Sequence, residues 1–457
     1  MTKKELESYL SLAMSTGADF AEIFYEKYHQ SMYHLIDKKI DKINTNDTLG
    51  VGIRIIKGKE NYYVSISSID NEVIINSINK LIKHFKGKSS KKVVLNKLKN
   101  NCMKVKIGHN EFLEEDKKAY LYKVDSLARK ESSLISQVSG ILLEVDRDFI
   151  LANSDGLYTK SNLIQTRVVT RVYAERDGRT ESEGRNLGKS VGYELLDEYP
   201  LEKYIKEIVS TAVEKLDAKD FKGGEYPVVI APGFGAVIFH EACGHGLEAT
   251  AVAPHLSVFS DDLGKKVASS KVTLIDDGTI PNSWGSFVIN DEGEKSEKNV
   301  LIENGILKSF LIDKSHELEM KMKSNGSGRR QSYKYAPTSR MSNTFLAPGK
   351  DKIEDMIKSI DYGVYCESMS GGSVNTATGD FNFSVETARL IEKGKLTKLV
   401  KGVALIGNSK DVLKNVEMVS DDLKIDAGYC GSKSGYIPVC IGQPTIKVSK
   451  ILVGGKE

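Results

Sequence analysis

The chain has few features that would tie it to a membrane, a disulfide framework or a polyanion. Its 457 residues include only five cysteines, and their irregular spacing argues against a disulfide framework. The apolar runs, such as residues 226–230, are far shorter than the roughly 20 residues that a membrane helix needs. With 65 basic and 62 acidic side chains the net charge is +3, which does not indicate a polyanion-binding protein.

The beginning of the chain and its overall composition favour a protein of the cytoplasm. Residues 1–7 are charged and lack the apolar core of a signal peptide. With 40% apolar and 28% charged residues, the chain fits a soluble globular protein that has room for two or three domains. A cytoplasmic protein would keep its thiols reduced, as a thiolate metal ligand requires.

The hydrophobic pattern predicts an α+β fold. We expect an N-terminal α/β-mixed domain, residues 1–190, with subdomains at about 1–90 and 108–190, and a mainly β C-terminal domain, residues 191–457, that carries a metal-binding helix. The expected helices are 4–15, 72–85, 116–130 and 201–216. The expected strands include 20–24, 32–36, 49–67, 139–144, 149–153, 164–175, 228–230 and 437–441.

One segment is unusually rich in lysine, and two others share a glycine-centred pattern. Residues 83–106 hold nine lysines and no acidic residue, so they are either a nucleic-acid patch or a solvated linker. Phe85 is the only Phe, Tyr or Trp among these lysines, which favours a linker between the two subdomains. Residues 301–307 and 390–396 each place a glycine between short apolar runs, and this pattern predicts two hairpins.

The most informative stretch is residues 240–245, H-E-A-C-G-H. Zinc hydrolases hold the ion through neutral imidazoles and use a nearby carboxylate to take a proton from water. His240 and His245 are five apart, so on a regular α-helix they would point about 140° away from each other. A π-type bulge or a helix break at Gly244 would return both rings to one face.

The surroundings of the motif favour a metal site over two ordinary histidines on an amphipathic helix. A buried strand at 228–230, a turn at 231–235 and the apolar residues 236–239 place the charged groups on a buried helix, where a metal would satisfy them. Glu248 lies three residues after His245 and could accept a hydrogen bond from a ligand histidine.

A catalytic zinc usually has three protein ligands and one open position, so a third ligand is expected. Cys243 lies three residues after His240, and Cys430 lies in a predicted loop, residues 427–432, with glycines at 428 and 431. Spacing alone ranks Cys430 only narrowly above Cys243. The other cysteines are expected to be structural: Cys102, Cys366 and Cys440.

The motif resembles the H-E-A-x-G-H-x-L-E signature of the TldD/PmbA metalloprotease family, in its metal-bearing TldD branch. In this chain residues 240–248 read H-E-A-C-G-H-G-L-E. Three further segments are similar to family blocks, in the same order: 328–344, 371–383 and 430–445. The resemblance covers nearly the whole chain and is strongest from about residue 226 onward.

The resemblance implies a zinc-dependent peptidase. Its metal ligands fall on His240, His245 and Cys430, its catalytic glutamate falls on Glu241, and the cofactor is one Zn²⁺ per active subunit. It further implies cleavage of short or unfolded peptides inside an enclosed cavity of a homodimer, or of a heterodimer with a metal-free paralogue. Composition adds the expectation of no direct nucleic-acid contact and no membrane partner.

The alternative is a non-enzymatic regulatory or binding protein with a structural metal, since some family members are described as modulators of DNA gyrase. Glu241 favours the enzyme, because a structural site has no need of a carboxylate beside its first ligand. If Cys243 and Cys430 both joined the histidines, the site would be closed. Arg329 and Arg330 follow a Ser/Gly-rich loop and are candidates for pairing with a peptide carboxylate.

Overall fold

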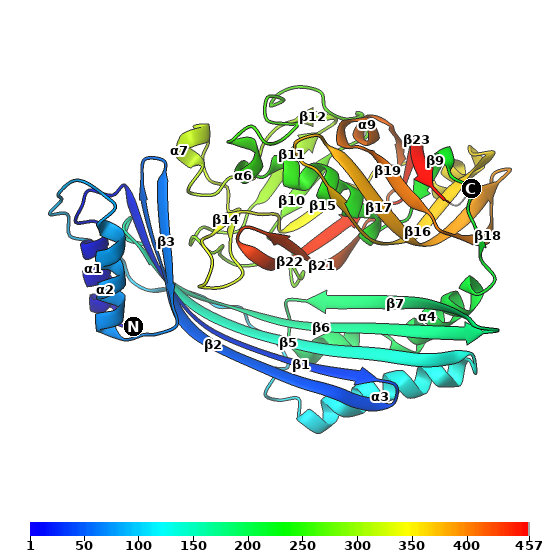
Figure 1. The fold of residues 1–457 in the computed structure, drawn as a ribbon, viewed down its shortest axis with the longest axis horizontal. Helices are drawn as coiled ribbons and strands as arrows, with labels where there is room; N and C mark the ends of the chain where they lie inside the picture. Colours follow the sequence, from blue (N-terminus) through cyan, green and yellow to red (C-terminus); the bar gives the residue numbers. More distant parts are fainter. Residues whose placement is uncertain (456–457) are drawn as a thin grey trace.

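The computed structural model describes residues 1–455. One large sheet and its helices form the N-terminal part, and the C-terminal part packs along one side of that sheet as a mainly β structure (Figure 1). The predicted α+β class, with a mainly β C-terminal domain, is confirmed. Among the described residues, no helix is long and apolar enough to cross a membrane.

The N-terminal sheet has seven strands in the order β3-β2-β1-β5-β6-β4, with β7 paired to β6. Adjacent long strands run antiparallel, and β1 pairs with β5 from Glu22 opposite Asn153 to Ile36 opposite Ser139. The strands are β1 (Phe20–Ile36), β2 (Lys39–Lys57), β3 (Glu60–Ile66), β4 (Lys99–Asn101), β5 (Ile135–Asn153), β6 (Tyr158–Arg176) and β7 (Arg179–Lys189).

Several predicted strands are longer than their apolar pattern indicated. The segments 20–24 and 32–36 are one strand, β1, and 139–144 and 149–153 are one strand, β5. Glu26, which lies between the two predicted segments of β1, is buried and paired with Arg147, so it does not end the strand. The segment 49–67 is instead split into β2 and β3 at Gly58, whose φ is +59°.

All four predicted helices are confirmed within a few residues: α1 (Lys3–Ala13), α2 (Asn71–Ile82), α3 (Glu114–Glu131) and α4 (Leu201–Lys215). A capping box at Thr2 and Glu5 begins α1. Helices α1 and α2 bury their apolar faces against β1 and β2. Helices α3 and α4 share a second core with β5 and β6, and a 3₁₀ turn, η1 (Tyr193–Glu198), precedes α4.

The lysine-rich segment forms an irregular connection. It has little regular structure apart from the short strand β4, in line with a linker. The two expected subdomains nevertheless share one sheet, because β1 and β5 pair over most of their length. The domain boundaries at 90, 108 and 190 stay predictions.

The C-terminal part contains a six-stranded sheet in the order β12-β11-β10-β15-β22-β21 and an eight-stranded sheet in the order β16-β9-β23-β19-β17-β18-β8, with β20 paired to β23. The six-stranded sheet consists of β10 (Leu274–Asp277), β11 (Lys298–Glu303), β12 (Ile306–Leu307), β15 (Asn343–Leu346), β21 (Lys424–Ser432) and β22 (Gly435–Gln443). The eight-stranded sheet consists of β8 (Lys219–Asp220), β9 (Gly224–Ile230), β16 (Tyr362–Val374), β17 (Asp380–Glu392), β18 (Lys395–Lys401), β19 (Ala404–Asn408), β20 (Val416–Val419) and β23 (Ile446–Gly454).

Short helical segments complete the C-terminal part, together with a two-stranded ribbon of β13 (Gly328–Arg329) and β14 (Thr338–Ser339). The helical segments are η2 (Phe234–Ala236), α5 (Val237–Phe239), η3 (His240–Gly244), η4 (His245–Leu247), α6 (Ala249–Val252), α7 (Glu317–Met320), α8 (Ile353–Lys358) and α9 (Ser409–Lys414). The apolar residues of the run from η2 to η4 are part of the most extensive apolar core within residues 1–455.

Both predicted hairpins are confirmed. Strands β11 and β12 are joined through Asn304 and Gly305, with φ of 49° and 84°. Strands β17 and β18 are joined through Lys393 and Gly394, with φ of 48° and 72°. Two consecutive residues with positive φ are typical of a type I′ turn, whose twist matches that of the flanking strands.

Buried ion pairs join the N-terminal sheet to the C-terminal part. These pairs are Arg54–Glu292, Arg147–Asp291 and Glu22–Arg330, and all six side chains are at least nine-tenths buried. Removing one partner from such a pair leaves an uncompensated charge and typically costs about 3–5 kcal/mol. The pairs therefore make the orientation of the two parts depend on specific residues.

Glu292 makes this interface sensitive to pH. Burial raises the pKa of its carboxyl to about 7 from the ordinary 4.5, with Arg54 opposing the shift and Asp313 adding to it. The folded chain therefore keeps a proton that the unfolded chain releases near pH 4.5. This contribution to stability is fully present below that pH and is lost as the pH rises through about 7. Its size is on the order of 3 kcal/mol.

The variant Glu292→Gln cannot ionise, so it should escape this loss. We expect the Tm of the wild type, measured relative to that of Glu292→Gln, to fall between about pH 5 and pH 8. Thermal unfolding of both proteins across this range measures the difference. A difference that does not change with pH would contradict the assignment.

Candidate metal centre

The helix that carries the histidines begins at a tight turn after β9. Gly233 has a φ of +88°, and the backbone N–H of Phe234 donates to the carboxylate of Asp426 at 2.7 Å. This bond ties the start of the helix to β21, on which Cys430 lies. Strand, turn and helix follow the order predicted for residues 228–239.

The five-residue spacing is accommodated by a π-helical turn. Residues His240–Gly244 form this turn, and it closes with a bond from the N–H of His245 to the carbonyl of His240. The two imidazole centroids lie 5.2 Å apart, with their planes at 83°. The predicted π-type bulge is therefore confirmed, and it returns both rings to the same side of the helix.

Gly244 is required at this turn by the close approach of another segment. A Cβ atom at this position would lie 2.1 Å from the Sδ atom of Met341, whose side chain is fully buried. The sequence indicated that a glycine makes the break in the helix easier. The structure adds a second reason, which is the packing of Met341 against the turn.

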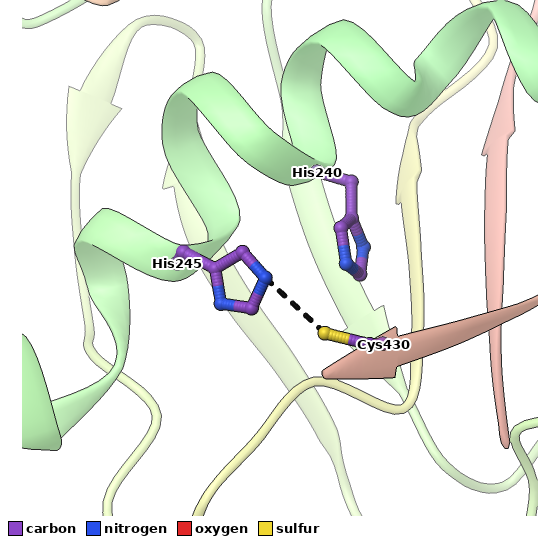
Figure 2. Close-up of side chains that lie close together, drawn as sticks. All are labelled: His240, His245 and Cys430. Carbon is purple, nitrogen blue, oxygen red and sulfur yellow. Dashed lines mark hydrogen bonds between the residues drawn. The ribbon is translucent and has the colours of Figure 1, made fainter. Parts of the chain in front are cut away.

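Cys430 approaches the histidines from a different element (Figure 2). Its Sγ atom lies 3.2 Å from Nε2 of His245. One candidate ligand atom from each of His240, His245 and Cys430 lies within 4.8 Å of the others. Cys430 lies in strand β21, opposite Ile437 of β22, so the expectation of a loop at 427–432 is wrong. The pairing with β22 gives the glycine-flanked segment its extended form.

The protonation of the site is set by the proximity of these groups. Burial disfavours a charged imidazole, yet the Glu248 carboxylate and the Cys430 sulfur raise the pKa of His245 well above its ordinary value. Burial likewise disfavours a thiolate, but the imidazoles of His240 and His245 hold the pKa of Cys430 well below its ordinary value. The thiolate form that metal binding requires is therefore favoured, and the proton that the raised pKa keeps on His245 would have to leave when an ion binds.

The residues present fit a divalent cation. The Nδ1 atom of His240 is buried and has no hydrogen-bond partner within residues 1–455, which is costly unless another group satisfies this side chain. Two imidazoles and a thiolate are a donor set that suits Zn²⁺. Cys243 is not part of the group: it is fully buried in the C-terminal apolar core, and burial raises the pKa of its thiol.

Two glutamates flank the three candidate ligands. Glu241 keeps a quarter of its side chain exposed, and its Oε2 atom lies 3.8 Å from Nε2 of His245. Glu248 is almost completely buried, and its Oε2 atom lies 3.1 Å from Nδ1 of His245. The carboxylate of Glu241 is therefore accessible to a small molecule, whereas that of Glu248 lies within hydrogen-bond distance of His245. The role of Glu248 in orienting a ligand imidazole stays a prediction.

Arg329 and Arg330 lie away from solvent and are held by the protein. Arg329 donates to the carbonyls of Met341 and Pro438 at 2.6 and 2.8 Å. Arg330 donates to the Glu22 carboxylate and, at 2.5 Å, to the carbonyl of Asp291. Both arginines line a cavity of about 600 Å³ between the N-terminal sheet and the β21–β22 hairpin. Their pairing with a peptide carboxylate stays a prediction.

Sequence reasoning assigned no role to Arg340, which the structure places next to the candidate ligands. Its guanidinium donates to the carbonyl of Cys430 at 2.6 Å. The only local signal was its position within a segment, 328–344, that resembles a family block. Its partners are about 90 residues away in sequence, so its role depends on the fold.

Comparison with known proteins gives a consistent result along the chain. Residues 223–455 match the model of the PmbA/TldA metallopeptidase C-terminal domain. Residues 110–217 match the model of the central domain of the same family, and residues 21–84 match the model of its domain 1.

Individual relatives cover nearly the full length. The "Metalloprotease TldD homolog" of Buchnera aphidicola is 34% identical over 96% of this chain and 93% of its own. The "Zinc metalloprotease TldD homolog" of Saccharolobus solfataricus is 26% identical over 98% and 99%. A solved structure from Thermotoga maritima, described as a modulator of a DNA gyrase, has a TM-score of 0.81 at 19% identity and covers 99% of this chain and 100% of its own. That likeness shows the fold.

Proposed function

Because this chain belongs to the PmbA/TldA metallopeptidase family, as the resemblance of residues 240–248 predicted, we propose that it is a zinc-dependent peptidase. The observation that carries the proposal is the group formed by His240, His245 and Cys430, whose ligand atoms lie within 4.8 Å of one another. The carboxylate of Glu241 lies beside this group. One relative is itself named a zinc metalloprotease.

In the proposed mechanism, His240, His245 and Cys430 hold the ion. A zinc ion held there would supply Lewis-acid chemistry for the scissile carbonyl and for the attacking water. Glu241 takes a proton from the attacking water and returns it to the leaving amine. Its partial exposure allows it to reach a water molecule, whereas the buried Glu248 holds the His245 ring by accepting from Nδ1.

The composition of the site supports a catalytic rather than a structural metal. A structural zinc has four protein ligands, but the group found among the described residues offers three, and the Cys243 thiol lies in the apolar core instead. A carboxylate beside a three-ligand site matches the arrangement of zinc hydrolases. The regulatory alternative, with a closed structural metal, is therefore less well supported.

We further propose that the substrates are short or unfolded peptides and that two subunits enclose the site, in the cytoplasm. The partner is a second copy of this chain or a metal-free paralogue. The family membership supports the substrate class and the pairing of subunits, and the free cysteines of residues 1–455 are consistent with that compartment.

A peptide digestion tests the proposed function. The zinc-loaded full-length chain, with its paralogue added where one is encoded, is incubated with a mixture of unfolded peptides, and the products are read by mass spectrometry. We expect cleavage that a chelator stops and added zinc restores, with unchanged circular dichroism because the core does not depend on one ion. Cleavage that persists after complete metal removal would contradict the proposal.

A further inference from the structure

Arg340 is a fully buried arginine in contact with the strand and turn that present the candidate thiol ligand. Its Nη1 atom donates to the Oγ of Ser434 and to the carbonyl of Gly435, both at 2.9 Å. Its Nη2 atom donates to the carbonyl of Cys430 at 2.6 Å. One guanidinium therefore binds the end of β21, the β21–β22 turn and the start of β22 simultaneously.

The same guanidinium faces the carboxylate that orients His245. The Nε atom of Arg340 lies 3.8 Å from Oε1 of Glu248, and these two atoms have no hydrogen-bond partner in the described part of the chain. The other oxygen of Glu248 lies 3.1 Å from Nδ1 of His245. A continuous chain of polar contacts thus runs from the carbonyl of Cys430 through Arg340 and Glu248 to His245.

We propose that Arg340 is a positioning residue of the metal centre, which fixes the Cys430 strand relative to His245 before the metal binds. The inference rests on the proposed function, because it assumes that these residues are metal ligands. Cys430 and the histidines lie about 190 residues apart in sequence and on separate elements, so something must fix their separation. Arg340 does this by donating to one element and facing the carboxylate that holds the other.

The chemistry of arginine explains why this residue type is needed. A planar guanidinium has five N–H donors in a fixed geometry, enough to serve three oxygens of the hairpin and one carboxylate together. Lysine has one compact ammonium, which cannot span the same acceptors. Ligands that are already in place lose less conformational freedom when the ion binds, so disturbing Arg340 should weaken metal binding.

The test is the zinc affinity of the full-length Arg340→Lys variant, measured by competition with a chromophoric chelator. Loss of an outer contact to a metal ligand typically weakens metal affinity by about 10–100-fold, and we expect a loss in this range. Co²⁺ gives a second readout, because its visible spectrum reports ligand geometry. We expect the Co²⁺ spectrum of the variant to change as well.

Two milder variants keep the test decisive where Arg340→Lys does not fold. Ser434→Ala removes one acceptor of the guanidinium, and Glu248→Gln removes the charge that it faces; both should weaken zinc binding, Ser434→Ala by a smaller factor. The double variant Arg340→Lys/Glu248→Gln should lose less zinc affinity than the product of the fold losses of the two single variants. Both substitutions act on one chain of contacts, so their effects should not be independent. The control is Arg54→Lys, a fully buried arginine at the domain interface, which should lower Tm without changing zinc affinity.

The outcomes separate this inference from the proposed function. If the wild type binds zinc and both Arg340→Lys and Ser434→Ala bind it with the same affinity, the role of Arg340 is overturned. The proposed metal centre itself would be unaffected by that result. If Arg54→Lys loses as much zinc affinity as Arg340→Lys, the loss reflects general destabilisation of the fold. That result would also overturn the role of Arg340. Wild-type protein without affinity for zinc would remove the proposed function itself.

Discussion

Replacing Glu241 with glutamine is expected to lower peptide turnover by about 10²–10⁴-fold, the usual contribution of general acid–base catalysis, and to leave bound zinc unchanged. Glutamine has nearly the same shape but cannot take a proton from water. The three candidate ligands are other residues, so the metal should stay. Single-turnover rates on one cleaved peptide, together with metal analysis of the same sample, measure both effects.

The matched control for this variant is Glu303→Gln, an equivalent change at an exposed glutamate of the β11–β12 hairpin. Its turnover and zinc content should equal those of the wild type. Equal turnover in Glu241→Gln would remove Glu241 from the mechanism. Loss of zinc in that variant would show that Glu241 is a ligand rather than a base.

Replacing Cys430 with alanine is expected to remove stoichiometric zinc and, with it, peptide cleavage. The Cys430 sulfur is the candidate thiolate of the group, 3.2 Å from Nε2 of His245, and two imidazoles alone leave the ion without its anionic protein ligand. The fold should persist, because Cys430 is one of many residues in a large core. Metal analysis after dialysis and circular dichroism of the same sample measure the two outcomes.

Two other cysteines provide controls for that experiment. Cys440 lies in β22, the strand paired with β21, and Cys243 lies within the π turn itself, yet neither is in the candidate ligand group. Cys440→Ala and Cys243→Ala should both retain one zinc per chain. If Cys243→Ala loses its zinc and Cys430→Ala keeps it, Cys243 and not Cys430 is the thiolate ligand.

The part of the site that is local in sequence could be predicted. The five-residue spacing of His240 and His245 and the glycine at 244 indicated a π-type turn, because helix geometry relates spacing directly to direction. The preceding strand and turn follow from the apolar residues and glycines that form them. The four long helices were predictable for the same reason, since their apolar positions recur with the helical period.

The parts of the fold that depend on pairing with another segment could not be predicted in the same way. Cys430 seemed to lie in a loop because glycines give no apolar alternation, and only pairing with β22 makes the segment a strand. Strand β1 appeared as two segments because Glu26 looks like an interruption until Arg147 is placed beside it. Pairings across more than a hundred residues leave no trace in a local pattern.

The buried arginines show the same limit more clearly. Arg329 and Arg330 were candidates for pairing with a peptide carboxylate, which stays a prediction, and the structure adds that both donate to acceptors within the chain. Arg340 gave no sign of contacting the element that carries Cys430. Arginine is usually exposed, so a sequence pattern favours a surface role, and only the buried acceptors around each guanidinium identify an internal one.

X-ray absorption spectroscopy at the zinc edge of the loaded wild-type protein tests the central claim most directly, because it counts the ligand atoms around the ion. Two imidazole nitrogens at about 2.0–2.1 Å, one sulfur at about 2.3 Å and one further light atom from water are the predicted set. A shell with two sulfurs, or one without sulfur, would contradict the three-ligand centre and the peptidase mechanism built on it.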